Sequence, residues 1–327
     1  KIKIRIGIRN LELRIRDWTR KNKSEFFYLV IILLLGAIFR LYKIDEYMTF
    51  LGDEGRDAII VRRLLVNFDP ILVGPGTSIG NMYLGPLYYY MMAPALLLAN
   101  FSPVGPAVMI ALLGVATIFF VWYVAREWFG NVAAFISAFL YSIAPVVITY
   151  SRSSWNPDIM PFFSLLSIYS IWKVWVKSEF KWLLVLGISF AFVLQSHYLG
   201  LLLVPTMGLF WMLSFLKIYH LPSTIYQPLK RNFIKYSLLG SAAFLILMSP
   251  LVIFDARHGW RNFSAIKIFF TERQTTVSAR PWTSIPKIWP IFRDDYISRI
   301  FVGTNLFWGK FAALAAAIAT FLYTLIN

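Results

Sequence analysis

Three carboxylates and an arginine crowd the segment Gly52–Asp57, which follows the first long apolar stretch of the chain. Ionisable groups next to hydrocarbon are costly and usually functional. If a helix begins here, Asp53, Arg56 and Asp57 share one face. A carboxylate in this position can act as a general base, and paired carboxylates can hold Mg²⁺ or Mn²⁺. The structural alternative is that Asp53 caps the helix while Glu54 and Asp57 offset its dipole.

Two further polar clusters, residues 151–158 and 195–198, also follow apolar stretches. Arg152 lacks an obvious acidic neighbour in sequence, and its planar guanidinium suits an anionic phosphate. Asp158 is either a second site carboxylate or part of a helix start, because Asn-Pro-Asp is also a good helix opening. His197 is either a hydrogen-bonded structural group or a phosphate ligand.

Together these clusters give a set of candidate site residues, to which the cations after a later apolar stretch are added. The candidate catalytic residues, which are also the candidate metal ligands, are Asp53, Glu54 and Asp158. The candidate phosphate-binding residues are Arg56, Arg152, His197, Arg257 and His258. We expect them to meet only if separate helix ends reach one face of a membrane, which is how sites in helix bundles are built.

The composition places the chain in a membrane. Of its 327 residues, 58% are hydrophobic and 18% aromatic, whereas soluble domains are about 45–50% apolar. The net charge of +16 fits basic loops beside apolar helices and argues against a nucleic-acid partner. Because there is no cysteine, disulfides and thiolate metal sites are excluded.

The apolar runs predict an all-α integral membrane protein with about eight spanning helices, in a bundle. The expected spans are residues 26–42, 105–125, 132–150, 159–176, 182–195, 199–216, 236–254 and 305–326. Residues 86–98 are too short for a span, contain Pro94, and open with three tyrosines, so we expect a juxtamembrane helix there. This topology puts the lysines near 173–181 and 217–235 in the cytoplasm, as the positive-inside rule asks.

The same rule predicts a cytoplasmic, basic N-terminal segment at residues 1–25, with the polar clusters on the extracytoplasmic side of the cell membrane. Residues 26–254 form the expected transmembrane module, whose first external loop is 43–104 and carries amphipathic juxtamembrane helices. An external loop at 255–304 and a last spanning helix at 305–327 complete the expected organisation. Because that helix lacks a polar flank, we expect the chain to be the front part of a longer protein.

Several short segments resemble one superfamily when taken in order. They are the Asp53-Glu54 pair, the Gly-Pro-Leu-Tyr-Tyr-Tyr segment at 85–90, the end of a span at 125–130, and the turn from Tyr150 to Asp158. In this order they resemble the membrane glycosyltransferases of the GT-C fold, in the branch of the protein O-mannosyltransferases and aminoarabinose transferases. The resemblance covers roughly residues 26–200.

The resemblance implies an inverting transfer of a sugar from a polyprenyl or dolichyl phosphate donor to a hydroxyl of a protein, lipid or glycan acceptor, on the extracytoplasmic face. It assigns Asp53 as the base or acceptor-orienting carboxylate with Glu54 beside it, Asp158 as a second acid, and Arg152 as a neighbour of the donor phosphate. A divalent cation stays open, since the arginines make it dispensable. One departure is Gly85, where aminoarabinose transferases carry a lysine.

Two other functions compete with the enzyme. A transporter or flippase for lipid-linked substrates would also place charges in the membrane, but it commonly shows internal repeats and helices broken at the midplane. A membrane anchor or assembly subunit would use the acidic cluster only as a helix cap. The charged clusters here lie at the ends of the expected spans, which favours the enzyme.

Overall fold

The structure, a computed structural model, describes residues 16–77, 82–220, 223–271, 285–303 and 305–326. Within these ranges the chain is helical, and the only β-type pairings are two isolated bridges, Thr49 with Ser153 and Gly76 with Tyr83. Most of the predicted basic segment 1–25 and part of the predicted loop 255–304 lie outside the described residues.

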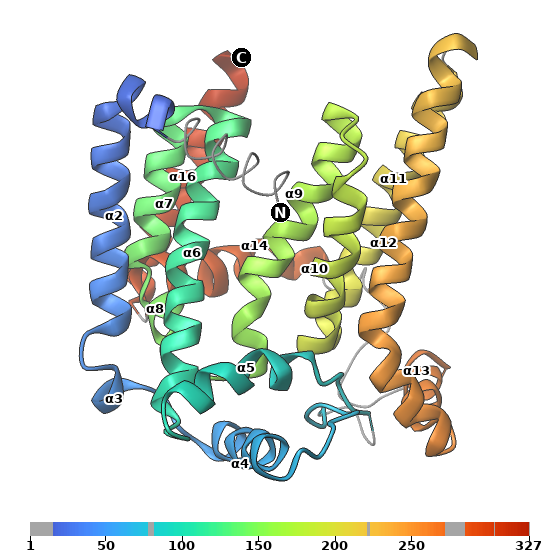
Figure 1. Ribbon diagram of the computed structural model, residues 1–327. Coiled ribbons are helices and arrows are strands. Elements are labelled where there is room, and N and C mark those ends of the chain that lie inside the picture. Colours follow the sequence, from blue (N-terminus) through green and yellow to red (C-terminus); the bar gives the residue numbers. More distant parts are fainter. Residues whose placement is uncertain (1–15, 78–81, 221–222, 272–284, 304, 327) are drawn as a thin grey trace.

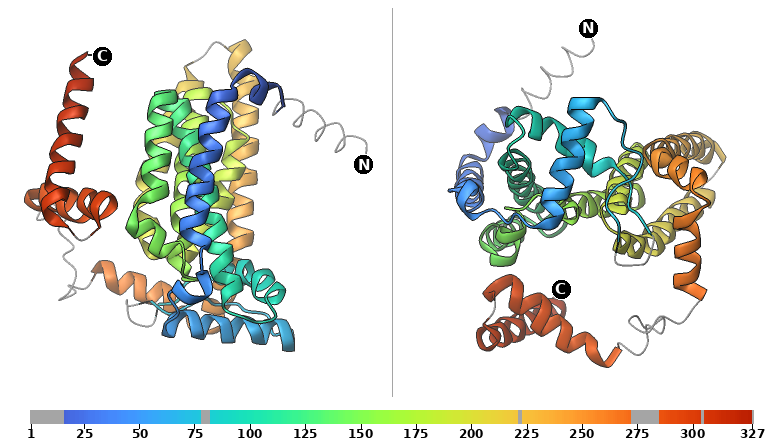
Figure 2. Two further views of the ribbon diagram at one scale, coloured as in Figure 1. Left: turned by 90° about the vertical axis from the view of Figure 1, so that its left-hand side faces the viewer. Right: turned by 90° about the horizontal axis from the view of Figure 1, so that it is seen from below.

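A bundle of roughly parallel and antiparallel helices makes up most of the molecule (Figure 1). Its helices are α2 (Lys23–Leu41), α6 (Val104–Phe129), α7 (Asn131–Ile143), α9 (Met160–Lys177), α10 (Trp182–Ser196), α11 (Leu203–Tyr219) and α12 (Ser223–Arg257). Short helices α8 (Pro145–Tyr150), η1 (Asn156–Ile159) and η2 (Tyr198–Leu202) continue three of them. Beyond α12 come α13 (Arg261–Thr271), α14 (Ile288–Pro290), η4 (Ile291–Ile297), α15 (Ser298–Val302) and α16 (Leu306–Ile326), and α16 stands beside the bundle (Figure 2).

Five helical segments in the described part of the chain are long and apolar enough to cross a membrane. They are Lys23–Leu41, Val104–Phe129, Asn156–Lys177, Tyr198–Tyr219 and Gln227–Arg257. Shorter apolar helices lie at Leu87–Leu98, Asn131–Ile143, Trp182–Ser196 and Phe307–Leu322. The prediction of an all-α, multi-span membrane protein is therefore confirmed, and five of the eight predicted spans are long and apolar enough in the described part of the chain to cross a membrane.

Three helices in the predicted first external loop gather at one end of the bundle, which we call the α4–α5 end (Figure 1). They are α3 (Ile44–Tyr47), α4 (Gly52–Asn67) and α5 (Leu87–Leu98). At 12 residues, α5 is too short to span and it contains Pro94. It lies across the end of the bundle, as expected for a juxtamembrane helix.

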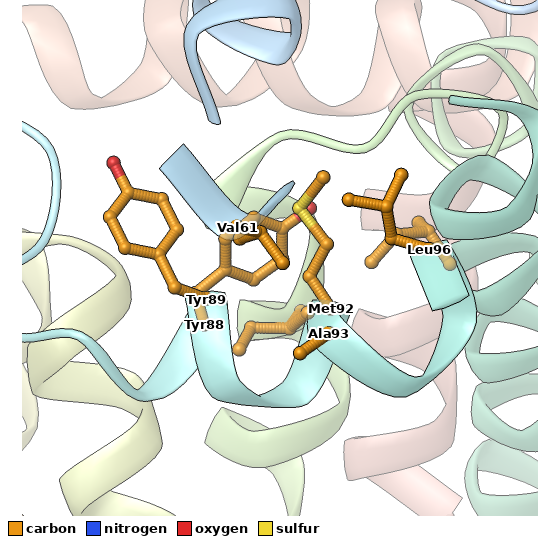
Figure 3. Close-up of a cluster of buried hydrophobic side chains, with 8 residues drawn as sticks. Val61, Tyr88, Tyr89, Met92, Ala93 and Leu96 are labelled. Atoms are coloured by element: carbon orange, nitrogen blue, oxygen red, sulfur yellow. The ribbon is translucent and has the colours of Figure 1, made fainter. Parts of the chain in front are cut away.

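An apolar cluster fastens α4 to α5 (Figure 3). Val61 of α4 is fully buried, and it packs with Tyr88, Tyr89 and Met92 of α5. Other apolar residues of α4 pack against the same cluster, so one face of α4 is buried in protein while Arg62 and Arg63 are exposed. The apolar residues of α4 thus pack on α5, and this packing positions the first turn of α4 at the α4–α5 end.

The chain differs from the sequence prediction at residues 132–150, where a single span was expected. Helix α7 ends at Ile143 and α8 starts again at Pro145, with Ala144 in an extended conformation between them. Proline lacks the N–H that would continue the helix, and it pushes the preceding residue out of helical geometry. Beyond the break, α8 lies nearer the α4–α5 end than α7 does (Figure 1).

Candidate active site

A pocket of about 230 Å³ opens at the α4–α5 end. Its walls come from the start of α4, the loop before α5, the segment between α8 and α9, and the turn after α10. The lining residues are Asp53, Arg56, Pro75, Gly76, Thr77, Leu84, Trp155, Asn156, Pro157, His197 and Tyr198. The three polar clusters of the sequence therefore meet around one cavity, although they are far apart along the chain.

The first turns of α4 place a chain of charges beside this pocket. Nη1 of Arg56 donates to Oδ1 of Asp53 at 2.7 Å, and its Nε and Nη2 donate to Oδ1 of Asp57 at 2.9 and 2.7 Å. The predicted common face of the three residues is present. Asp53 lines the pocket with its side chain 51% exposed, so its carboxylate is held by Arg56 and still open to a ligand.

Asp57, which the sequence left outside the candidate set, holds the guanidinium of Arg56 in place from inside the protein. Its side chain is 0% exposed, and its Oδ1 also accepts from the hydroxyl of Tyr89 on α5 at 3.0 Å. Burial raises the pKa of Asp57 above the usual aspartate range, against the lowering effect of Arg56. Within the described residues its Oδ2 has no hydrogen-bond partner. The sequence signal was the position of Asp57, four residues from Asp53 on the same face.

Glu54 does not line the pocket. It is 6% exposed, its Oε2 accepts from the backbone N–H of Leu51 at 2.9 Å, and its Oε1 accepts from the hydroxyl of Ser153 at 2.7 Å. The first bond caps the start of α4 and the second joins α4 to the segment before η1. The capping role that the sequence offered for Asp53 therefore falls on Glu54, and the geometry gives Glu54 a positioning role.

Asp158 makes a similar cap in η1. Its Oδ2 accepts from the backbone N–H of Trp155 at 3.2 Å, and the side chain is half-buried. Its neighbours Asn156 and Pro157 line the pocket, whereas Asp158 is absent from the lining. The arrangement matches the helix-start alternative, because the carboxylate is already used at the opening of η1.

Arg152 also lies outside the pocket lining. Its Nη2 donates to the carbonyl of Tyr42 at 2.7 Å, and its guanidinium lies 5.1 Å from the ring centre of Tyr47. Tyr42 directly follows α2 and Tyr47 is the last residue of α3, so both partners lie over a hundred residues away along the chain. Arg152 thus holds the end of α2, a contact that no local sequence pattern could indicate.

His197 faces the pocket from the turn after α10. Its Nδ1 accepts from the backbone N–H of Leu199 at 3.2 Å, which leaves Nε2 as the protonated nitrogen of the neutral ring. Burial lowers the pKa of His197 below the usual histidine range. The ring of Tyr198 lies 4.4 Å from it between centres. His197 therefore lines the same cavity as Asp53, and its Nε2–H is left to donate.

Arg257 and His258 are exposed at the end of α12 and do not line the pocket. Nδ1 of His258 is 2.7 Å from the carbonyl of Phe254, and the two rings stack with centres 4.1 Å apart. Of the predicted phosphate-binding cations, the structure places Arg56 and His197 at the cavity.

The described part of the chain does not supply a complete set of ligands for the predicted Mg²⁺ or Mn²⁺ site. No three His, Cys, Asp or Glu side chains there come close enough together to hold a metal ion. Of the three candidate ligands, only Asp53 lines the pocket. The Mg²⁺ or Mn²⁺ site therefore stays a prediction.

Gln195 connects the pocket to the bundle. Its Nε2 donates to the carbonyl of Leu247 on α12 at 2.9 Å, and its Oε1 lies 3.4 Å from the N–H of Leu87 at the start of α5. A Cβ at Gly85 would lie only 2.0 Å from that Oε1. The glycine at this position therefore makes room for Gln195, and a lysine would not fit here.

Comparison with known families agrees with this arrangement. A family profile described as dolichyl-phosphate-mannose-protein mannosyltransferase matches residues 84–254, which is more than half of the 327 residues. The chain belongs to this mannosyltransferase family. The resemblance found in the sequence is thereby confirmed, and the matched region of the chain includes α5, η1 and the turn that carries His197.

Two individual relatives extend the comparison. The fold is similar to that of the Archaeoglobus fulgidus oligosaccharyltransferase, which was crystallised with Zn and sulfate, with a TM-score of 0.52 and 17% identity over 92% of this chain and 43% of that one. The chain is also 26% identical over 108 residues to YkcB of Bacillus subtilis (strain 168), a protein whose name describes it as a mannosyltransferase by inference. The aligned region covers 32% of this chain and 15% of YkcB. The structural similarity confirms the GT-C-like fold, and the chain spans less than half the length of either relative.

Proposed function

We propose that the protein is a membrane glycosyltransferase that moves a sugar from a polyprenyl-phosphate or dolichyl-phosphate donor to an acceptor hydroxyl. The observation that carries the proposal is Asp53, an exposed carboxylate held by Arg56 at the rim of the pocket. Glu54 and Asp158 are occupied as helix caps, so Asp53 is the carboxylate left for chemistry. Family membership supports the same activity.

The reaction is a single displacement at the anomeric carbon. The acceptor oxygen forms the new glycosidic bond while the bond from the anomeric carbon to the phosphate oxygen breaks, and the electron pair leaves with the phosphate. Asp53 takes the proton from the acceptor hydroxyl, a role that contributes about 10²–10⁴-fold to rate. Attack from the face opposite the leaving phosphate inverts the anomeric configuration.

The leaving phosphate needs positive charge or N–H donors that are already in place. Arg56 and His197 line the same pocket as Asp53 and are the residues we assign to this task. Trp155 and Tyr198 add aromatic surface to the walls. The acceptor hydroxyl belongs to a protein, a lipid or a glycan, the same three classes that the sequence allowed.

We infer the side of the membrane from the course of α2 and the positive-inside rule. Helix α2 runs from the basic N-terminal side of the chain to the α4–α5 end, where the pocket lies (Figure 1). If the basic segment is cytoplasmic, the pocket lies on the extracytoplasmic face of the cell membrane. The alternatives of a flippase and an assembly subunit lose ground, because neither requires a held carboxylate facing a cavity.

Asp53→Asn tests the proposal. The full chain in proteoliposomes, supplied with a polyprenyl-phosphate hexose and an acceptor extract, is assayed for release of polyprenyl phosphate. We expect release to fall by about 10²–10⁴-fold with donor binding retained. The control is Asp69→Asn, an exposed aspartate that lies 3.8 Å from Arg63. Equal release by wild type and Asp53→Asn would refute the enzyme, and transbilayer movement of the donor without release would favour the flippase.

A further inference from the structure

Arg40 is a cation buried inside the bundle. It lies in the last turn of α2, an apolar helix long enough to span a membrane, and it is 0% exposed. Within the described residues, no carboxylate oxygen lies within 4.0 Å of it. A buried charge without an acidic partner needs other polar groups, because its desolvation is costly.

Backbone carbonyls supply those polar groups. Nη1 of Arg40 donates to the carbonyls of Gly36 and Ser142, both at 3.0 Å, and its Nη2 donates to the carbonyl of Tyr141 at 3.2 Å. The contacts to Ser142 and Tyr141 cross more than a hundred residues of sequence and join α2 to the end of α7.

These carbonyls are free because of the break between α7 and α8. In a continuous helix the carbonyl of Tyr141 would accept from the N–H four residues later, but that residue is Pro145, which has none. The carbonyl of Ser142 loses its partner because the chain turns away at Ala144. Arg40 therefore donates to two carbonyls that the broken helix leaves unpaired.

The packing around Arg40 is fitted to its guanidinium. A Cβ at Gly114 of α6 would lie 3.0 Å from Nε of Arg40 and 2.9 Å from Oγ of Ser151. Glycine at this position leaves room for both groups. Arg40 is thus enclosed by α2, α6, the end of α7 and the residue that follows α8.

We infer that Arg40 is a positioning residue that fixes the α7–α8 break and, through α8, the pocket wall. Helix α8 leads directly to Ser153, the hydrogen-bond partner of Glu54, and then to Trp155–Pro157, which line the pocket. Moving the break moves these residues relative to Asp53. The consequence for catalysis rests on the proposed function, whereas the positioning itself does not.

A distance measurement tests the inference without any substrate. The chain has no cysteine, so nitroxide labels can be placed on Ile59→Cys of α4 and Tyr150→Cys of α8, both exposed sites. We expect Arg40→Gln in the full chain to shift the distance between the labels by about 3 Å, two residues of helical rise, or to broaden it markedly. Arg40→Lys, which keeps the charge but loses the fork, should fall in between.

A matched control separates this effect from the loss of any arginine. Arg126, at the opposite end of the bundle, is paired with Glu25, and Arg126→Gln should leave the distance from 59 to 150 unchanged. A folded, monodisperse Arg40→Gln protein with the wild-type distance overturns the inference. If Arg40→Gln does not fold, the same distance is measured in Arg40→Lys and in Gly114→Ala. Wild-type distances in both variants overturn the inference.

Activity provides the second arm. With the assay for polyprenyl phosphate release, Arg40→Gln should lower the rate by about 10²-fold, since an ångström of misplacement in a site costs about that much. Suppose that Arg40→Gln shifts the distance between the labels but Asp53→Asn releases polyprenyl phosphate as fast as wild type. This result would refute the proposed function and leave the positioning role of Arg40 standing. An unchanged distance refutes the positioning role alone.

Discussion

Gly85→Ala is the most direct test of how α5 is seated on the bundle. The added Cβ would lie 2.0 Å from Oε1 and 2.3 Å from Cδ of Gln195, so one side must move. Gln195 is 1% exposed and its Nε2 is bonded to the carbonyl of Leu247 at 2.9 Å. The side chain therefore has little room to move away without losing that bond.

The cost follows from two effects. Overpacking a well-packed core costs about 1–3 kcal/mol. If Gln195 is displaced, the carbonyl of Leu247 is left without its partner, which costs about 1–3 kcal/mol more. We expect Gly85→Ala to lower the free energy of unfolding by about 2–6 kcal/mol, the sum of the two ranges.

The assay is thermal or denaturant unfolding in detergent, followed by the fluorescence of the 12 tryptophans. The control is Gly208→Ala in α11, where an added Cβ meets nothing within 4 Å, and which should stabilise by about 0.5–1 kcal/mol because alanine loses less entropy in a helix. Removing the obstacle should help, so Gly85→Ala combined with Gln195→Ala should cost less than the two single changes added together. Gly85→Ala as stable as wild type, or strict additivity in the double variant, would refute the steric reasoning.

Three more predictions concern the site. Glu54→Gln should lower the free energy of unfolding by about 1–3 kcal/mol, since one of two accepted hydrogen bonds is lost. It should reduce the release of polyprenyl phosphate less than Asp53→Asn does. A Glu54→Gln protein that is as stable as wild type but as inactive as Asp53→Asn would contradict this prediction. The pKa of His197 is lowered by burial, so its contribution to stability is present above the unfolded value of about 6.5 and is lost as pH falls. The wild-type melting temperature should thus drop more between about pH 7.5 and 5.5 than that of His197→Gln, and parallel drops would show that His197 does not titrate this way. Arg257→Gln should leave the release rate unchanged because Arg257 is exposed and outside the pocket, and a tenfold loss would return it to the phosphate site.

The architecture was largely predictable because membrane constraints act on long stretches of sequence. Apolar length separated the spanning helices from α5, and amphipathic juxtamembrane helices were predicted in the first external loop. The shared face of Asp53, Arg56 and Asp57 followed from helical spacing alone. Each of these inferences uses residues within a single helix, whose geometry is fixed by its own backbone.

The roles of individual charged residues were less predictable, because they depend on contacts between distant segments. Glu54 and Asp53 are adjacent, yet one binds Ser153 and the other faces the pocket. Arg152 binds the carbonyl of Tyr42, and Arg40 binds carbonyls that only a broken helix exposes. The sequence did hold a signal for Arg40, since an arginine within an apolar span is a functional hypothesis by default.

Every pocket-lining residue comes from a helix terminus or a connecting loop, and none comes from the middle of a bundle helix. Substitutions that reshape the cavity can therefore accumulate without disturbing the contacts between helices in the hydrocarbon. Descendants of such a scaffold are free to change the sugar they accept or the hydroxyl they modify while keeping one membrane framework. Swapping residues 68–86 between family members is a practical starting point for engineering altered specificity.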